Sequence, residues 1–153
     1  MNFTSVNKIF EKSIKENWDR PAISNYQGVT LHYRDLARRI AKLHIMFEEC
    51  GLERGDKVAL CSRNQANWVV SFLAAMTYGA VPVPLMHEFQ PSNINHLVNH
   101  AESKILFVDE VIWEGLSELE MGDLQAIIQV NTFKLLYSAN DKITESRERL
   151  NEL

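Results

Sequence analysis

Glycine is scarce in this sequence, with six glycines among 153 residues. None of them completes the G-x-G-x-x-G pattern of dinucleotide-binding folds or the G-x-x-x-x-G-K-[ST] pattern of phosphate loops. Such loops use glycine because backbone N–H groups approach a phosphate closely only where no side chain intervenes. The sequence therefore offers no loop that predicts a nucleotide-phosphate site.

Potential metal and redox ligands are also sparse. The two cysteines, Cys50 and Cys61, lack metal or redox spacing, so we expect buried free thiols in a reducing cytoplasm. His96 and His100 stand four apart, which is zinc-ligand spacing on a helix. They lie off the apolar stripe of that helix and have no third ligand in reach, so an exposed pair is the favoured interpretation. His87-Glu88 does not begin a zinc-protease motif, because proline occupies the position of the second histidine.

Positive charge is not in excess, and long apolar runs are missing. The formal net charge is −4, whereas duplex binding needs a basic stripe, so nucleic acid is excluded as the main partner. Four cations, Arg34, Arg38, Arg39 and Lys42, are interpreted as a solvated helix face. The longest apolar run, 68–76, is too short to span a bilayer. No charged-then-apolar leader opens the chain, and we expect a cytoplasmic protein.

The clearest organisation lies between residues 51 and 85. The run KVALC at 57–61 predicts a short buried strand, and 81–84 predicts another. The intervening segment 65–78 is apolar nearly all round, which predicts a buried helix with Asn64 as its N-cap. Trp68 and Phe72 are expected to be largely buried in it. Strand, helix and strand in this order form a βαβ unit with parallel strands.

The rest of the sequence continues the alternation of helices and strands. Upstream, the patterns predict an amphipathic helix ending near Asn17, a hairpin over 22–26 and 29–31, and a helix over 33–50 with His32 at its capping position. Downstream, they predict a helix capped by Ser92, a strand over 105–108, a short helix over 111–119, a strand over 126–130 and a polar helix over 142–153; 132–137 is ambiguous. This order predicts an α/β fold with three layers, α/β/α, a mainly parallel sheet and a small N-terminal hairpin.

Two groups of polar residues directly follow predicted strands. Asp109 and Glu110 follow one strand, where acids can hold magnesium or a ribose, although a turn and helix start is the favoured interpretation. Ser62, Arg63 and Asn64 follow another strand, and helix capping accounts for Asn64.

The ordered set of residues from 33 to 85 carries a resemblance. It comprises Tyr33-Arg34-Asp35-Leu36, Gly51, Gly55-Asp56-Lys57-Val58-Ala59, Asn64, Trp68, Phe72-Leu73-Ala74 and the run from Gly79 to Leu85. This set resembles the N-terminal part of the adenylate-forming acyl-CoA synthetases, the AMP-binding ligases that activate fatty and other carboxylic acids. The similarity extends from about residue 3 to residue 109 and lies outside the catalytic motifs of that family.

The resemblance implies that residues 1–153 are the N-terminal part of a large AMP-binding domain, a partial domain of a larger enzyme without its phosphate loop or C-terminal domain. It implies that the full enzyme uses ATP, Mg²⁺ and CoA to convert a carboxylic acid, best taken as a long-chain fatty acid, to acyl-CoA through an acyl-adenylate. No family motif for catalysis, cofactor or metal matches this sequence, so no catalytic, cofactor-binding or metal residue is assigned, and the chain alone is expected to be inactive.

The implied partners are the remainder of the synthetase chain, a fatty acid and CoA. The full enzyme could also lie peripherally on a membrane, and an incomplete core would favour self-association through exposed apolar surface. A second hypothesis stays open: a self-contained, flavodoxin-like α/β binding or interaction module without catalysis, because fold does not fix function. A phosphate loop encoded after Leu153 would favour the synthetase.

Overall fold

The computed structural model describes residues 5–116 and 120–151. Its helices are α1 (Val6–Glu16), α2 (Tyr33–Glu49), α3 (Ala66–Tyr78), α4 (Pro91–His100), α5 (Glu110–Trp113) and α6 (Asp141–Asn151). Its strands are β1 (Pro21–Ser24), β2 (Thr30–His32), β3 (Lys57–Cys61), β4 (Val81–Leu85), β5 (Ile105–Val108), β6 (Ala126–Gln129) and β7 (Leu135–Ser138). Within these described residues, no helix has both the length and the apolar character needed to cross a membrane.

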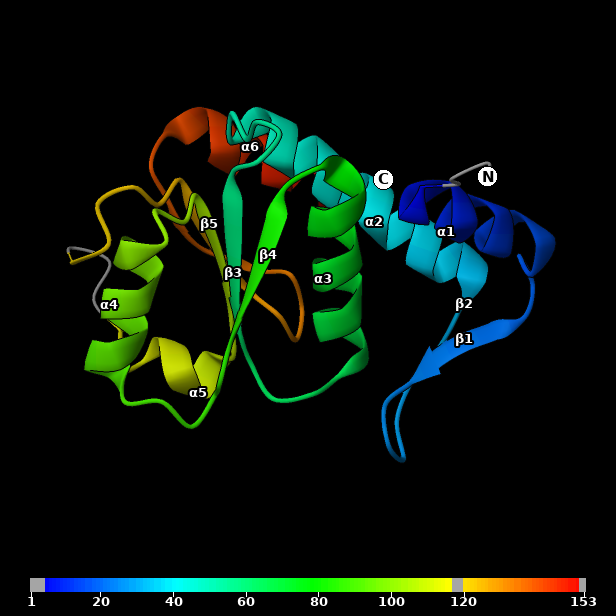
Figure 1. The fold of residues 1–153 in the computed structure, drawn as a ribbon, viewed down its shortest axis with the longest axis horizontal. Coiled ribbons are helices and arrows are strands. Elements are labelled where there is room, and N and C mark those ends of the chain that lie inside the picture. Colours follow the sequence, from blue (N-terminus) through cyan, green and yellow to red (C-terminus); the bar gives the residue numbers. More distant parts are fainter. Residues whose placement is uncertain (1–4, 117–119, 152–153) are drawn as a thin grey trace.

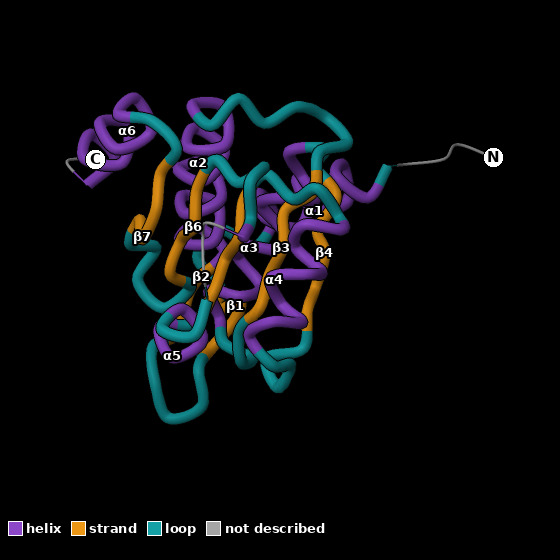
Figure 2. Tube along the Cα trace, turned by 90° about the vertical axis from the view of Figure 1, so that its left-hand side faces the viewer, coloured by secondary structure: helices purple, strands orange, loops and turns teal. Residues whose placement is uncertain are grey.

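The main sheet has the strand order β4-β3-β5-β6-β7 (Figure 2). Strands β4, β3, β5 and β6 are parallel, and β7 pairs antiparallel with β6. All four predicted strands therefore lie in one mainly parallel sheet, which confirms the prediction. The chain places β4 on one side of β3 and then returns to place β5 on the other side, so β3 is an interior strand.

Helices cover both faces of this sheet (Figure 1). Val58 and Leu60 of β3 face a core formed with α2, α3 and α6, where Phe47, Val70 and Ile143 are buried. The alternate residues of β3 face a second core under α4, with α5 packed at its edge. Because the interior strands are buried on both faces, their sequences are apolar throughout rather than alternating. The predicted three-layer α/β/α fold is confirmed.

Strands β1 and β2 form the predicted small antiparallel hairpin, separate from the main sheet. Its turn includes Gln27 at φ 53°, and the N–H of Gly28 donates to the carbonyl of Asn25 at 3.0 Å. At the following helix, the side chain of Asp35 accepts from the N–H of His32 at 2.9 Å. Asp35 thereby satisfies a free N–H at the start of α2, where His32 makes a poor side-chain cap.

Helix α3 is the buried helix that its composition predicts, since each of its residues is buried or half-buried. Gly79 ends it at φ 96°, a left-handed conformation that favours glycine. Trp68 and Phe72 are partly buried against the core and stack on each other with ring centroids 5.4 Å apart. The prediction that both are largely buried is confirmed in part, because neither is fully enclosed. Trp68 lies beside β4, the outermost strand, where no further strand of the described chain covers it.

Two predicted helix caps are also wrong. The N-cap of α3 is Gln65 rather than Asn64, and its side chain makes no capping hydrogen bond. The N-cap of α4 is Gln90 rather than Ser92, because Pro91 occupies the first helical position. Proline is favoured there since it has no N–H that needs a partner.

The C-terminal third departs from prediction in its details. The short helix predicted over 111–119 ends at Trp113 as α5, and positions 117–119 lie outside the described residues. The ambiguous segment 132–137 contains the start of β7. In α6, Ile143 is buried, and the side chains of Leu150 and Leu153 lie outside the described part.

Candidate functional site

The candidate site lies where the carboxyl ends of β3, β4 and β5 meet at one edge of the sheet. Ligands of open α/β sheets gather at this edge, beside the point where the strand order reverses. The loop 62–65 follows β3, the loop 86–90 follows β4, and Asp109 follows β5. The tip of the hairpin reaches the same region and contacts the start of α3. Four segments that are distant in sequence thus converge here.

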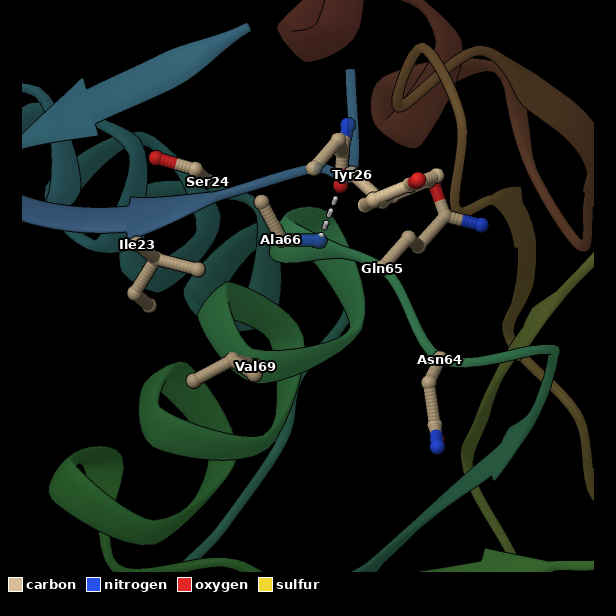
Figure 3. Close-up of a pocket in the computed structure, with 8 residues that line it drawn as sticks. Ile23, Ser24, Tyr26, Asn64, Gln65, Ala66 and Val69 are labelled. Atoms are coloured by element: carbon tan, nitrogen blue, oxygen red, sulfur yellow. Dashed lines mark hydrogen bonds between the residues drawn. The ribbon is translucent and has the colours of Figure 1, made fainter. Parts of the chain in front are cut away.

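Two hollows open beside the loop 62–65. The first, of about 460 Å³, lies between the hairpin and α3 (Figure 3) and is lined by Ile23, Ser24, Asn25, Tyr26, Asn64, Gln65, Ala66 and Val69. The second, of about 280 Å³, lies between the loop and the end of β4 and is lined by Ser62, Asn64, Trp68, Pro84, Leu85, Met86, His87 and Glu88. Asn64 lines both, so the loop forms a wall shared by the two hollows.

Asp109 holds this loop from the side of β5. Its carboxylate accepts a hydrogen bond from the backbone N–H of Arg63 at 2.7 Å and one from Nε2 of Gln65 at 3.3 Å. Its side chain is only 3% exposed, and the Arg63 guanidinium, 3.7 Å away, is its ion-pair partner. Asp109 occupies the N-cap position of α5, as a turn and helix start requires, but its side chain makes no cap bond. The prediction of a turn and helix start at Asp109 is therefore correct for the backbone. It does not account for the side chain, which bonds to the loop 62–65 instead of capping α5.

Asn25 holds the other end of the loop from the hairpin. Its Oδ1 accepts from the N–H of Ala66 at 2.8 Å, which is the capping bond that we had expected Asn64 to make (Figure 3). Sequence patterns do not identify Asn25, because the residue that it caps lies 41 positions away.

A second asparagine missed by sequence reasoning, Asn67, links three elements. It accepts from Nη1 of Arg39 at 2.6 Å and donates to the carbonyl of Asn131 at 2.9 Å. Arg34 and Arg39 are half-buried, so interpreting the basic residues of α2 as a uniformly solvated face is wrong for these two. Arg38 and Lys42 are exposed as expected.

The histidine and cysteine side chains show no sign of a metal centre. His96 and His100 are exposed and stack on each other, as the helical pattern predicts. Across residues 5–116 and 120–151, no group of three or more His, Cys, Asp or Glu side chains is placed to hold a metal ion. Cys50 and Cys61 are buried free thiols. Burial raises the pKa of Cys50 to about 12 and that of Cys61 to about 11, so neither is a thiolate nucleophile near neutral pH.

The buried thiols therefore supply no activated nucleophile to this site. Its carboxylate is already engaged by the loop, and the exposed polar groups at its surface are amides, the hydroxyls of Ser24 and Tyr26, and the flanking His87 and Glu88. A parallel three-layer fold with a ligand edge of this kind defines the architecture of an α/β ligand-binding domain.

Comparison with known sequences identifies the family. The sequence model of the AMP-binding enzymes matches residues 10–151. The chain belongs to the AMP-binding enzyme family.

Its relatives within the family differ in kind. The chain is 24% identical over 108 residues to surfactin synthase subunit 2 of Bacillus subtilis (strain 168), covering 71% of this chain and 3% of that protein. It is 30% identical over 79 residues to fatty acyl-CoA synthetase A of Dictyostelium discoideum, covering 52% of this chain and 12% of that protein. The chain thus spans a small fraction of the length of either relative.

A solved structure gives the same fold. The long-chain-fatty-acid-CoA ligase FadD1 from Archaeoglobus fulgidus superimposes with a TM-score of 0.74 at 18% sequence identity. The match covers 95% of this chain and 30% of that one. At this identity the likeness establishes the fold, and the five-stranded sheet with its hairpin corresponds to part of the larger ligase structure.

Proposed function

We propose that this chain is the N-terminal part of the large domain of an ATP-dependent acyl-CoA synthetase whose substrate is a long-chain fatty acid. The observation that carries the proposal is the match of the AMP-binding family to residues 10–151. The 30% identity to a fatty acyl-CoA synthetase supports the choice of a fatty acid as substrate.

In the proposed reaction, a carboxylate oxygen of the fatty acid bonds to the α-phosphorus of ATP, and pyrophosphate leaves. The CoA thiol then bonds to the acyl carbon, AMP leaves, and the products are acyl-CoA and AMP. The described residues do not fit ATP and Mg²⁺, because they contain neither a glycine-rich phosphate loop nor a cluster of three metal ligands. We therefore place phosphate and magnesium binding in another part of the polypeptide and assign no chemical step to these residues.

The role left to this chain is to build a scaffold and one wall of the site. Its cores on both faces of the sheet fix the strand ends, and the clamped loop 62–65 presents a shaped surface at the ligand edge. Rigid elements position site residues more accurately than mobile loops do.

A second candidate is amino-acid activation by a peptide synthetase. The relationship to surfactin synthase subunit 2 favours it, because that alignment covers more of this chain than the alignment with the fatty acyl-CoA synthetase does. Membership of the AMP-binding family argues against the flavodoxin-like binding module.

The two candidates are separated by ATP–pyrophosphate exchange in the complete polypeptide that contains this chain. The assay uses long-chain, short-chain and aromatic acids and the standard amino acids, followed by mass-spectrometric detection of CoA thioesters. We expect exchange with long-chain fatty acids and a matching acyl-CoA. Exchange with an amino acid and no thioester would instead identify a peptide-synthetase domain, and no exchange with any acid would contradict both.

A further inference from the structure

We infer that Asp109 and Asn25 are positioning residues that hold the loop 62–65 so that Asn64 faces a ligand in the second hollow, at the end of β4. The inference rests on the proposed function only in taking that ligand to be a substrate of the synthetase. Asn64 is the residue that contacts the ligand, and the other two act through the loop.

The loop is held at both ends by side chains from elsewhere in the chain. The N–H of Arg63 donates to Oδ2 of Asp109 at 2.7 Å, and the N–H of Ala66 donates to Oδ1 of Asn25 at 2.8 Å. Asp109 lies at the end of β5 and Asn25 lies in the hairpin turn, so the loop is gripped from two sides. The Ala66 N–H, a donor that a helix start normally leaves to water or to a local cap, is thereby fixed by the tertiary structure.

Further hydrogen bonds stiffen the loop between these two anchors. The hydroxyl of Ser62 donates to the carbonyl of Arg63 at 2.7 Å. Nε2 of Gln65 lies 3.3 Å from both the Ser62 hydroxyl and Oδ1 of Asp109. Ser62 itself is buried, and its hydroxyl is hydrogen-bonded within the loop. Asn64, by contrast, lies on the exposed side of the loop. The loop therefore has a defined shape before any ligand arrives.

The charge of Asp109 is more than a simple cap needs. Burying a carboxylate costs several kcal/mol unless hydrogen bonds and an opposite charge compensate it, and a neutral Asn or Ser would cap an N–H more cheaply. Here the ion-pair partner, Arg63, is 67% exposed and so contributes weakly. The buried charge provides a short, strong hydrogen bond to the Arg63 N–H, since charged acceptors bind N–H groups more tightly than neutral ones.

Asn64 is the part of the loop left free by this arrangement. It is exposed, it lines both hollows, and within the described chain its side-chain amide has no protein hydrogen-bond partner. In Figure 3 its side chain extends away from the hairpin strands. An amide offers donors and an acceptor together, and presenting it on a preformed loop reduces the ordering cost that binding a ligand would otherwise carry.

The clamp is tested by amide hydrogen exchange in the chain itself, measured by NMR. Asp109→Asn should raise the exchange rate of the Arg63 amide by about tenfold or more while leaving Ala66 protected, and Asn25→Ala should do the reverse. Glu110→Gln, which removes the adjacent exposed acid, is the matched control and should change neither amide. Unchanged protection of Arg63 in a folded Asp109→Asn variant would overturn the clamp.

The ligand contact is tested by the kinetics of the complete polypeptide. Asn64→Ala should raise KM for one substrate by about fivefold or more with kcat within about twofold, because only binding to the site is lost. Asp109→Asn should raise KM for the same substrate, and Glu110→Gln should not. Unchanged KM for acid, ATP and CoA in Asn64→Ala would overturn the contact. An enzyme with no activity on any acid would refute the proposed function and leave the exchange result standing.

Discussion

A single ring nitrogen of His44 joins two helices. Its Nε2 lies 3.0 Å from the carbonyl of Ala74 and 3.0 Å from the hydroxyl of Thr77, so α2 is tied to the last turns of α3. The ring also packs against the edge of Tyr78, with ring centroids 5.4 Å apart. Burial lowers the pKa of His44, and the hydrogen bond to Ala74 opposes this only in part.

This shift makes stability depend on pH. Because the pKa of His44 is lower in the folded chain than its ordinary value of 6.5, the unfolded chain binds the proton more readily. The contribution of His44 to the free energy of unfolding is therefore present above that value and is lost as the pH falls through it. We expect His44→Gln, which keeps an N–H donor, to lose less stability between pH 7.5 and pH 5.5 than the unmodified chain.

Urea unfolding at the two pH values measures this difference, and the comparison cancels the titration of all other groups. His96→Gln serves as the control, because it removes an exposed imidazole and leaves the partly buried ring of His44 in place. An equal loss of stability in His44→Gln and the unmodified chain would show that another group is responsible.

At the residue scale, sequence reasoning failed where partners are distant. The position of Asn64 after a strand correctly predicts that a helix starts nearby, but the capping oxygen comes from Asn25, and the Arg63 N–H bonds to Asp109, 46 positions away. Local sequence patterns predict hydrogen bonds only between residues that are near in sequence, so they do not predict these two bonds. The exposed His96–His100 pair was predictable because an apolar stripe, a local feature, fixes which side of α4 faces the sheet.

At the scale of elements, the partial exposure of the Trp68 ring reduces the stability that α3 loses when this side chain is truncated. Trp68→Ala should cost about 1–3 kcal/mol of unfolding free energy, because a fully packed aromatic side chain costs roughly 3–5. Phe47→Ala, at a site with no exposure, is the matched comparison and should reach that higher range. Urea unfolding of both variants provides the test, and an equal cost for the two would show that Trp68 is as tightly packed as the core.

Strand β4 ends the sheet with an edge that lacks donors. The N–H of Val81 points inward to the carbonyl of Asp56, so alternation directs the backbone of Pro82 and Pro84 outward. Proline has no N–H, and both outward positions of β4 therefore offer only carbonyl oxygens. Such an edge resists pairing with another strand.

Restoring those donors should promote association. We expect the double variant Pro82→Val, Pro84→Val to form more dimers or larger species than the unmodified chain at the same concentration. Sedimentation velocity measures this difference. Pro21→Val is the control, because Pro21 lies in the small hairpin and not at this edge. If the double variant and the control sediment alike, the prolines do not protect the edge.

The elements themselves were largely predictable. Runs of apolar residues such as 57–61 and 105–108 identify interior strands, because a strand covered on both faces needs no polar alternation. Strand β7 escaped identification because it pairs on only one side, is half-buried along its length and follows a turn in which Phe133 has φ 57°. Its sequence therefore carries neither the fully apolar pattern nor a regular turn signal.

At the scale of the whole molecule, the chain alone should not carry out adenylation. Holding a triphosphate requires several N–H donors, a magnesium ion and cationic side chains together, and a net charge of −4 offers no general attraction for a polyanion. We expect isothermal titration to detect no heat of MgATP binding. We also expect ATP–pyrophosphate exchange with a panel of fatty acids to stay at the background rate. The catalytically competent control is the complete polypeptide, and exchange by the chain alone would refute the fragment proposal.

The same chain should associate with itself. Apolar side chains are exposed on several separate elements, including Val6 and Ile9 of α1, Val81 of β4 and Met86 after it. Where such side chains lie together in one patch, they bind a partner in larger assemblies and otherwise drive association. Light scattering should show species larger than 17.6 kDa at high concentration. A strictly monomeric and highly soluble chain would favour a self-contained module instead.

The interior position of β3 also has a consequence for synthesis on the ribosome. Strand β4 follows β3 after a single helix, but β5 must pass β4 to reach the opposite edge of β3. A nascent chain that has completed β4 but not β5 therefore presents one unpaired edge of KVALC, with apolar side chains on both faces. Chains emerge at roughly 5–20 residues per second, so this interval lasts on the order of seconds. During that time the free edge of β3 is open to pairing with another strand.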